Sequence, residues 1–229
     1  MPTPAILFDI DGTLVDSNYL HVHAWQRAFA EVGVDVEAWR IHRGIGMDGS
    51  SLLDELLPDA TDDDTKARAK DLHSGFYQET AHLLKPLPGT RRLLDLVAAT
   101  GLQVVLATSA PEDELALLRK VLDQDEIVSA VTSSDDVDTA KPRPDIVEVA
   151  LQRAGVGSDR AVFVGDSIWD IRAAARAGVE CIGVESGGVD RLRLQDEGAV
   201  AVYRNPRDLA DQFDDSPIGR LAAGVSTGH

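Results

Sequence analysis

Short runs of apolar residues alternate along this chain with longer segments in which apolar residues recur at helical spacing. The first run, residues 4–8, ends abruptly at Asp9, as a strand buried on both faces does. Comparable runs lie at residues 102–107, 127–131, 161–164 and 179–184, and helical patterns lie at 91–100, 112–122, 144–154 and 168–177. Strands alternating with helices of this length predict an α/β fold with a parallel sheet covered on both faces.

Residues 17–85 interrupt this alternation, because they contain no convincing strand pattern. They predict instead a series of amphipathic helices at residues 19–32, 36–42, 50–57 and 63–84. The chain then returns to the α/β pattern through residues 85–89, where two prolines stiffen the connection. We therefore expect a helical module at 17–85, an α/β core formed by 1–16 and 86–215, and a flexible tail at 216–229.

The charge balance argues against several classes of partner. Thirty-nine acidic and 22 basic residues give a formal net charge of −17, which repels nucleic-acid phosphates and anionic lipid. No segment approaches the ~20 consecutive apolar residues of a membrane helix, and no signal-peptide pattern opens the chain. The single cysteine, Cys181, lies in an apolar run and is expected to be a buried strand thiol. We expect a cytoplasmic protein, either a monomer or a homodimer, that binds neither nucleic acid nor membrane.

Polar side chains follow the predicted strands at the points where the strands end. The first strand is followed by Asp9, Asp11, Gly12 and Thr13, and the second by Thr108 and Ser109. Lys141 comes after the third strand, at the head of the next helix, and Asp166 and Asp170 follow the fourth strand. In an open parallel sheet these strand ends form one edge, where ligands bind. Acids gathered there would repel one another without a cation, and Mg²⁺ takes one or two carboxylates together with a substrate phosphate. The pattern therefore predicts Mg²⁺ as the cofactor.

Four such groups in this order resemble the motifs of the haloacid dehalogenase-like hydrolases, whose core is a Rossmann-like parallel sheet. The helical module after the first group resembles the cap domain of the subgroup that contains phosphoglycolate phosphatase and β-phosphoglucomutase. The resemblance covers nearly the whole chain. It implies an Mg²⁺-dependent phosphatase that hydrolyses a small phosphorylated metabolite, phosphoglycolate-like or sugar-phosphate-like, through an aspartyl phosphate.

The resemblance also implies roles for the two acids of the first motif. Asp9 is the nucleophile that becomes phosphorylated. Asp11 protonates the leaving oxygen and then deprotonates the attacking water. Because Asp11 must carry a proton when the alcohol leaves, it is the carboxyl group whose pKa we expect repulsion among the acids to raise.

The remaining motif residues are expected to bind the metal and the phosphoryl group. By the resemblance, Mg²⁺ is held by Asp9, the main-chain carbonyl of Asp11 and Asp166, with Asp170 behind them as an outer ligand or as a partner of Lys141. Lys141 also supplies positive charge to the phosphoryl oxygens. The phosphate site further includes Thr108 and Ser109, which precede a helix N-terminus, and Gly12 and Thr13.

The helical module contributes the candidates for substrate contact. His21 lies on its first helix, and Arg43 begins a glycine-containing loop that enters the active site in the resembling family. Trp25 is expected to be a core residue. Met47 stands where the resembling sugar-phosphate mutases tend to carry an arginine that binds a second phosphate, so this position favours a phosphatase.

Other activities are distinguished by particular residues. The main alternative is a β-phosphoglucomutase-like mutase, which would need a bisphosphate activator. Retention of Asp11, Asp166 and Asp170 argues against 2-haloacid dehalogenation. Phosphonate cleavage would need a cap lysine, and Lys66 and Lys70 are expected on a polar helix surface; a non-enzymatic binding module would be supported only if metal failed to bind. Phosphoglycolate, small sugar phosphates and nucleoside monophosphates all stay open as substrates.

Overall fold

The computed structural model describes residues 2–136 and 141–226. Within these residues a parallel sheet has the strand order β3-β2-β1-β4-β5-β6. The strands are β1 Ala5–Phe8, β2 Gln103–Ala107, β3 Val128–Thr132, β4 Ala161–Gly165, β5 Glu180–Val184 and β6 Ala201–Tyr203. The predicted α/β fold with a parallel sheet is confirmed, and β6 is a strand that the hydrophobic pattern did not predict.

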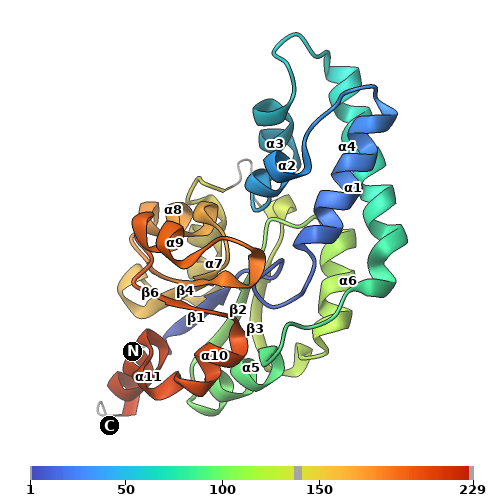
Figure 1. Ribbon diagram of the computed structural model, residues 1–229. Coiled ribbons are helices and arrows are strands. Elements are labelled where there is room, and N and C mark those ends of the chain that lie inside the picture. Colours follow the sequence, from blue (N-terminus) through green and yellow to red (C-terminus); the bar gives the residue numbers. More distant parts are fainter. Residues whose placement is uncertain (1, 137–140, 227–229) are drawn as a thin grey trace.

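Helices cover both faces of the sheet (Figure 1). One face carries α5 Thr90–Ala99, α6 Glu112–Leu122, α10 Pro206–Asp211 and α11 Pro217–Ser226, and the other carries α7 Asp145–Ala154, α8 Ile168–Arg176 and α9 Arg191–Asp196. Short 3₁₀ turns lie at η1 Ala81–Leu83, η2 Asp125–Ile127, η3 Ser134–Asp136, η4 Ser158–Arg160, η5 Glu185–Gly187 and η6 Phe213–Asp215. None of the helices in the described ranges is long and apolar enough to span a membrane.

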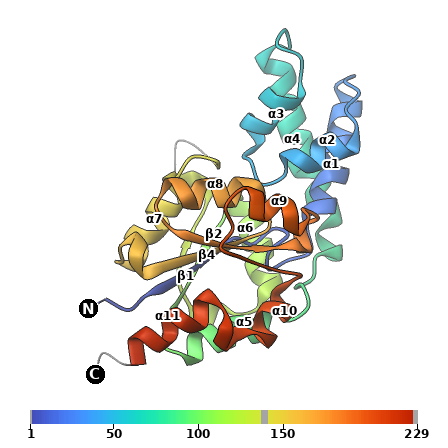
Figure 2. The ribbon, with the colours of Figure 1, turned by 60° about the vertical axis from the view of Figure 1, so that its left-hand side comes forward.

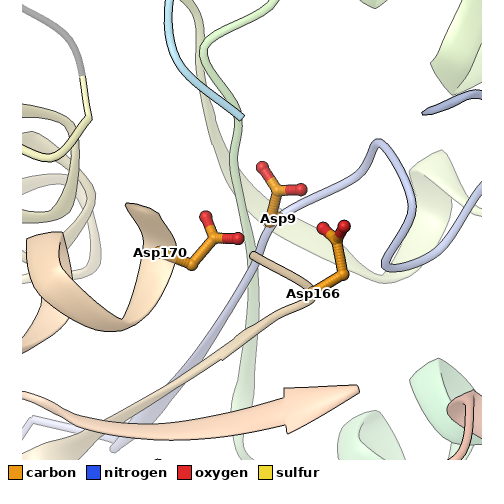
Figure 3. Close-up of side chains that lie close together, drawn as sticks. All are labelled: Asp9, Asp166 and Asp170. Carbon is orange, nitrogen blue, oxygen red and sulfur yellow. The ribbon is translucent and has the colours of Figure 1, made fainter. Parts of the chain in front are cut away.

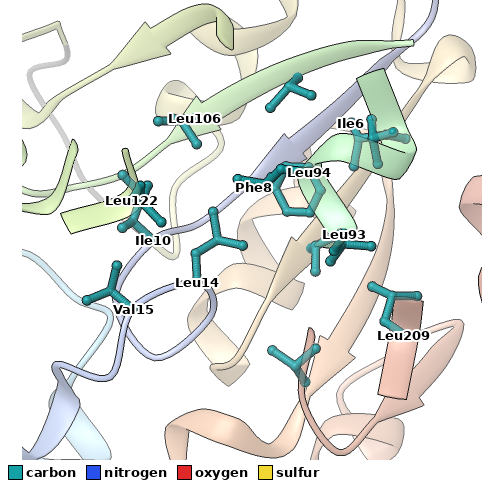
Figure 4. Close-up of a cluster of buried hydrophobic side chains, with 14 of the residues drawn as sticks. Ile6, Phe8, Ile10, Leu14, Val15, Leu93, Leu94, Leu106, Leu122 and Leu209 are labelled. Atoms are coloured by element: carbon teal, nitrogen blue, oxygen red, sulfur yellow. The ribbon is translucent and has the colours of Figure 1, made fainter. Parts of the chain in front are cut away.

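Alternation along β1 explains why its sequence is uniformly apolar. Ile6 and Phe8 join the apolar cluster under α5 and α6, whereas Ala5 and Leu7 join the cluster under α7 and α8. Figure 4 shows Ile6 and Phe8 packed among leucines of the first cluster. Successive side chains of a strand point to opposite faces, so a strand between two helical layers needs an apolar residue at every position.

Four helices lie between β1 and α5 in the chain: α1 Asn18–Glu31, α2 Ala38–Gly44, α3 Gly49–Leu56 and α4 Asp63–Thr80. They stand above the sheet and its covering helices in both ribbon views (Figures 1 and 2). Their apolar faces form a separate cluster that includes Trp25, Phe29 and Leu52, and Trp25 is a core residue as predicted. We call residues 18–80 the helical insert.

The C-terminal segment differs from the expectation of a flexible tail at residues 216–229. Residues 217–226 form α11, in which Ile218 is fully buried and joins the apolar cluster on the α5 face of the sheet. The hydroxyl of Ser216 accepts a hydrogen bond from the Gly219 N–H and so caps the first turn of the helix. The prediction is therefore wrong for residues 217–226, and residues 227–229 lie outside the described residues.

Candidate functional site

Three carboxylates lie together at the carboxyl end of the sheet, beside β1, where the strand order reverses. The chain places β2 on one side of β1 and β4 on the other, which is the topological switch point where open α/β sheets bind ligands. Asp9 follows β1, Asp166 follows β4, and Asp170 lies in the first turn of α8. One oxygen from each lies within 4.8 Å of the other two, and Figure 3 shows the three carboxylates gathered at the strand ends.

Lys141 neutralises part of this charge. Its Nζ donates a hydrogen bond to Asp9 Oδ1 at 2.6 Å and lies 2.7 Å from Asp170 Oδ1, and its side chain is almost completely buried. The other oxygen of Asp170 accepts hydrogen bonds from the Ser167 N–H and hydroxyl, at 3.0 and 2.6 Å. With both oxygens engaged, Asp170 orients Lys141 toward Asp9.

Burial and mutual repulsion shift the pKa values of these acids. Burial raises the pKa of Asp9 to about 7, with Lys141 opposing the shift and Asp170 and Asp11 adding to it. The pKa of Asp166 lies well above its usual range, because of burial and then the charges of Asp170 and Asp9. One ammonium group does not balance these acids, so Asp9, Asp166 and Asp170 have the donor set and the excess negative charge that fit a hard divalent cation such as Mg²⁺.

Asp11 lies beside this group, and its electrostatics differ from the expectation. Its Oδ1 accepts a hydrogen bond from the Ser17 hydroxyl at 2.5 Å and lies 3.3 Å from His21 Nε2. Burial acts to raise the pKa of Asp11, but hydrogen bonds from His21 and Ser17 and the charge of His21 outweigh it, and the pKa is lowered. The prediction of a raised pKa for Asp11 is therefore wrong. The two acids whose pKa is raised are Asp9 and Asp166.

A second histidine supports His21. His21 Nδ1 lies 3.2 Å from His73 Nε2, and the His21 ring stacks on Tyr77 with ring centroids 3.9 Å apart. Burial opposes protonation of His21, but its hydrogen bond to Asp11 and the Asp11 charge raise its pKa, whereas burial lowers the pKa of His73. His73 comes from α4, and we did not predict it because only the packing of α1 on α4 brings the two rings together.

Gly12 and Thr13 act on Asp166 rather than lining the open space. The Thr13 hydroxyl donates to Asp166 Oδ1 at 3.1 Å. Asn18, which we did not predict, donates through Nδ2 to Asp166 Oδ2 at 2.8 Å. Gly12 has φ +71°, and an added Cβ there would lie 2.3 Å from Asn18 Nδ2 and 2.6 Å from Asp166 Oδ2. Only glycine fits this turn, so Gly12 lets Asn18 reach Asp166.

A cavity of about 140 Å³ opens in front of the carboxylates, between the core and the helical insert. Asp9, Asp11, His21, Thr108, Ser109, Lys141 and Asp166 all contribute to its wall. Thr108 Oγ1 accepts the Ala110 N–H at 3.0 Å. The Ser109 hydroxyl is buried and has no hydrogen-bond partner among the described residues, so it is available to donate to an anion in the cavity.

Three further charged residues of this cavity were missed: Glu114, Lys70, and Asp48, whose carboxylate caps α3. Glu114, on α6, is 4 % exposed, and burial raises its pKa to about 7, with the charge of His21 opposing the shift. The buried positions of α6 are Glu114, Leu115, Leu118 and Leu122, so Glu114 is the polar member of an inward stripe that the sequence shows. Lys70 also lines the cavity, whereas we expected it only on a polar helix surface, and Lys66 instead pairs with Asp54.

Arg43 does not line the cavity that holds Asp9, Asp11 and Lys141. Its guanidinium lies over the Trp39 ring, 4.8 Å from the centroid, and it lines a neighbouring cavity of about 790 Å³ instead. Asp166 lines both cavities, whereas Met47 lines the smaller one. The structure thus separates the two residues of this loop that the sequence analysis singled out.

The fold and the site together define an α/β enzyme whose centre consists of strand-end carboxylates and one buried lysine. Residues 6–184 match the family described as haloacid dehalogenase-like hydrolase. The chain belongs to this family and is a hydrolase, as the resemblance predicted.

Named relatives and a solved structure support the same family assignment. A phosphorylated carbohydrates phosphatase of Thermotoga maritima is 30% identical over 204 residues, which cover 87% of this chain and 94% of the relative. A phosphoglycolate phosphatase of Yersinia pestis is 32% identical over 192 residues, covering 80% and 81%. The crystal structure of a hydrolase from Pseudomonas syringae superposes with a TM-score of 0.88 at 34% identity, covering 93% of this chain and 98% of that one.

Proposed function

We propose that this protein is an Mg²⁺-dependent phosphatase that hydrolyses a small phosphorylated metabolite through an aspartyl phosphate on Asp9. The observation that carries the proposal is the buried ion pair between Lys141 and Asp9 at the edge of a cavity that also holds Asp11 and Asp166. Lysine orients the nucleophilic oxygen and stabilises charge on the phosphoryl group, which is where electrostatics contributes most to phosphoryl transfer.

Two displacements at phosphorus complete the reaction. In the first, an Asp9 oxygen bonds to phosphorus, the bond from phosphorus to the leaving oxygen breaks, and the proton held by the Asp11–His21 pair passes through Asp11 to that oxygen. In the second, water attacks phosphorus, Asp11 takes the water proton, and the Asp9 carboxylate is released with phosphate. The hydrogen bonds from Ser17 and His21 hold Asp11 in position for both steps.

Mg²⁺ would be bound by the carboxylates of Asp9 and Asp166 and by the main-chain carbonyl of Asp11. The bound metal would neutralise charge so that the Asp9 carboxylate and an anionic phosphoryl group can approach each other. Asp170 is engaged by Lys141 and Ser167, which supports a positioning role for it behind the metal site. The free Ser109 hydroxyl and Lys141 would bind the phosphoryl oxygens.

A compact substrate fits the site best. The cavity of about 140 Å³ is smaller than the roughly 300–1,000 Å³ typical of ligand pockets. The relatives from Thermotoga maritima and Yersinia pestis, named for phosphorylated carbohydrates and phosphoglycolate, support a small metabolite. Met47 lines the cavity and cannot bind a second phosphate dianion, so hydrolysis is favoured over mutase activity.

Phosphate release from a panel of phosphomonoesters tests this function. The wild type should release phosphate with Mg²⁺ and lose release with excess chelator, and Asp9→Asn should lower the rate at least about 10³-fold, because the nucleophile is gone. Asp95→Asn, an exposed change on α5, is the matched control and should keep full activity. Metal binding with no phosphate release, but with turnover of a sugar monophosphate when bisphosphate is added, would instead establish the mutase.

A further inference from the structure

The carboxylate of Glu114 is buried and unpartnered in the wall of the active-site cavity. It is 4 % exposed and lies in the cavity lining with Asp11, His21 and Lys70. Among the described residues, no hydrogen bond or ion pair holds it. The other acids of the centre all have partners: Asp9 has Lys141, Asp11 has Ser17, and Asp166 has Asn18.

Packing alone does not explain a glutamate at this position. The other buried positions of α6 are leucines, and a leucine at residue 114 would continue the same apolar stripe. A buried carboxylate without a partner costs several kcal/mol in principle. A protein that keeps such a group either uses it to bind a ligand or tolerates the loss of stability. Glu114 is also absent from the carboxylate group that fits a metal ion, so the metal is not its partner.

The surroundings restrict the chemistry of that ligand group. Glu114 lines the same cavity as Asp11, the residue that protonates the leaving oxygen in the proposed reaction. Its neighbour Asp113 accepts a hydrogen bond from Gln78 of α4 at 2.8 Å, so this turn of α6 lies against the helical insert, on the side where the leaving group of the proposed reaction would bind. A carboxylate on the leaving group would meet Glu114, Asp11 and Asp48 as like charges. An ammonium group would be attracted by these carboxylates and repelled by Lys70, but neither substrate type for which the relatives are named carries one. A hydroxyl group carries no charge and can donate to Glu114 while accepting from Lys70.

We propose that Glu114 is a specificity residue that hydrogen-bonds a hydroxyl group of the leaving alcohol, and that the enzyme prefers polyol or small sugar phosphates to carboxylate-bearing phosphates such as phosphoglycolate. This inference rests on the proposed hydrolysis at Asp9. It selects one of the two substrate types for which the relatives are named.

A matched pair of substrates tests the preference. Glycerol 3-phosphate and 3-phosphoglycerate have the same three-carbon skeleton and differ at carbon 1, where one carries a hydroxymethyl group and the other a carboxylate. The wild type should show a kcat/KM at least about tenfold higher for glycerol 3-phosphate. Glu114→Gln, which keeps the hydrogen-bonding capacity but loses the charge, should reduce this ratio about tenfold by improving 3-phosphoglycerate.

Two further variants keep the test independent of folding defects. Glu114→Leu should lower kcat/KM for glycerol 3-phosphate about tenfold, because the hydrogen bond is lost while the apolar stripe of α6 is continued. Asp95→Asn removes a charge from an exposed position on α5 and should leave the ratio unchanged. A wild type that prefers 3-phosphoglycerate, or a ratio that Glu114→Gln does not move, would overturn the proposal.

A binding measurement separates failure of this inference from failure of the proposed function. Calorimetric titration of Asp9→Asn with each of the two compounds compares their affinities without turnover. If glycerol 3-phosphate binds Asp9→Asn more tightly than 3-phosphoglycerate does, and if Asp9→Asn/Glu114→Gln narrows this difference by binding 3-phosphoglycerate more tightly, the role of Glu114 is supported even if no phosphate is released. Equal affinities, together with Asp9-dependent release of phosphate from p-nitrophenyl phosphate, would leave the hydrolysis standing and refute the specificity.

Discussion

The carboxyl group of Glu114 makes the stability of this protein depend on pH. Burial raises its pKa from 4.5 to about 7, with His21 and Lys70 opposing the shift and Asp11 and Asp113 adding to it. The folded state therefore holds the Glu114 proton more tightly than the unfolded state does. Stability from this group is complete below about pH 4.5 and declines as the pH rises to about 7.

Removing this titration should stabilise the protein at high pH. Glu114→Gln should raise the free energy of unfolding by about 3 kcal/mol at most at about pH 8, and by little at about pH 5. Urea denaturation of wild type and variant at both pH values measures the difference, in which the titration of groups common to both proteins cancels. An equal gain at the two pH values would show that the effect is one of packing rather than of charge.

Residue chemistry also explains where the prediction for the acids failed. The sequence shows that Asp9, Asp11 and Asp166 come together, but the pKa of each depends on its hydrogen-bond partners. Asp11 receives hydrogen bonds from Ser17 and His21, which favour the charged form. Ser17 is the N-cap residue of α1 and His21 lies in the helix itself, and the strand-end pattern contains no information about their orientation.

At the scale of elements, the hydrophobic pattern did not predict β6, α10 or α11. β6 extends one edge of the sheet, and α10 and α11 pack on the face that also carries α5 and α6. Both helices carry start signals that hydrophobic periodicity does not detect. The Asn205 side chain accepts from the Asp208 N–H and Pro206 occupies the first turn of α10, and Ser216 caps α11, which begins at Pro217. A capping residue followed by proline is a recognised helix start, so these two helices were within reach of sequence analysis.

The buried face of α11 gives a prediction for stability. Ile218 is fully buried in the core, so Ile218→Ala should lower the free energy of unfolding by about 2–5 kcal/mol through lost burial and the cavity left behind. Ile218→Val, which removes a single methylene, should cost about 0.5–1.5 kcal/mol. Denaturant unfolding of the two variants measures both values. Values near zero for both variants would show that α11 does not pack on the core.

At the scale of the whole molecule, the active-site cavity exists because the insert rests on the core. Several hydrogen bonds join the two parts: Asn18 to Asp166, His42 Nε2 to the Gly187 carbonyl at 2.8 Å, and the Trp169 indole N–H to the Arg43 carbonyl at 3.1 Å. Arg43 thus contributes its main chain to this junction. Binding at the carboxylates is consequently linked to the stability of the folded molecule.

Mg²⁺ should therefore raise the thermal unfolding temperature of the wild type. At a free concentration 100 times Kd the stabilisation is about 2.7 kcal/mol, because the proposed Mg²⁺ site exists only in the folded protein. Asp166→Asn should lose the shift, while the exposed Asp95→Asn should keep it. Differential scanning calorimetry with Mg²⁺ and with chelator measures the shift. A shift that persists in Asp166→Asn would place the metal elsewhere.

The sequence by itself determined the parallel α/β core, the helices of the insert and the strand-end residues Asp9, Lys141 and Asp166. It could do so because strand ends converge at one edge of a parallel sheet, whatever the details of packing. Only the tertiary structure decided the partners of Asp11, the position of Arg43 in the neighbouring cavity, and the places of His73 and Glu114. Those features depend on how the helices of the insert pack on one another and on the core, which local periodicity does not encode.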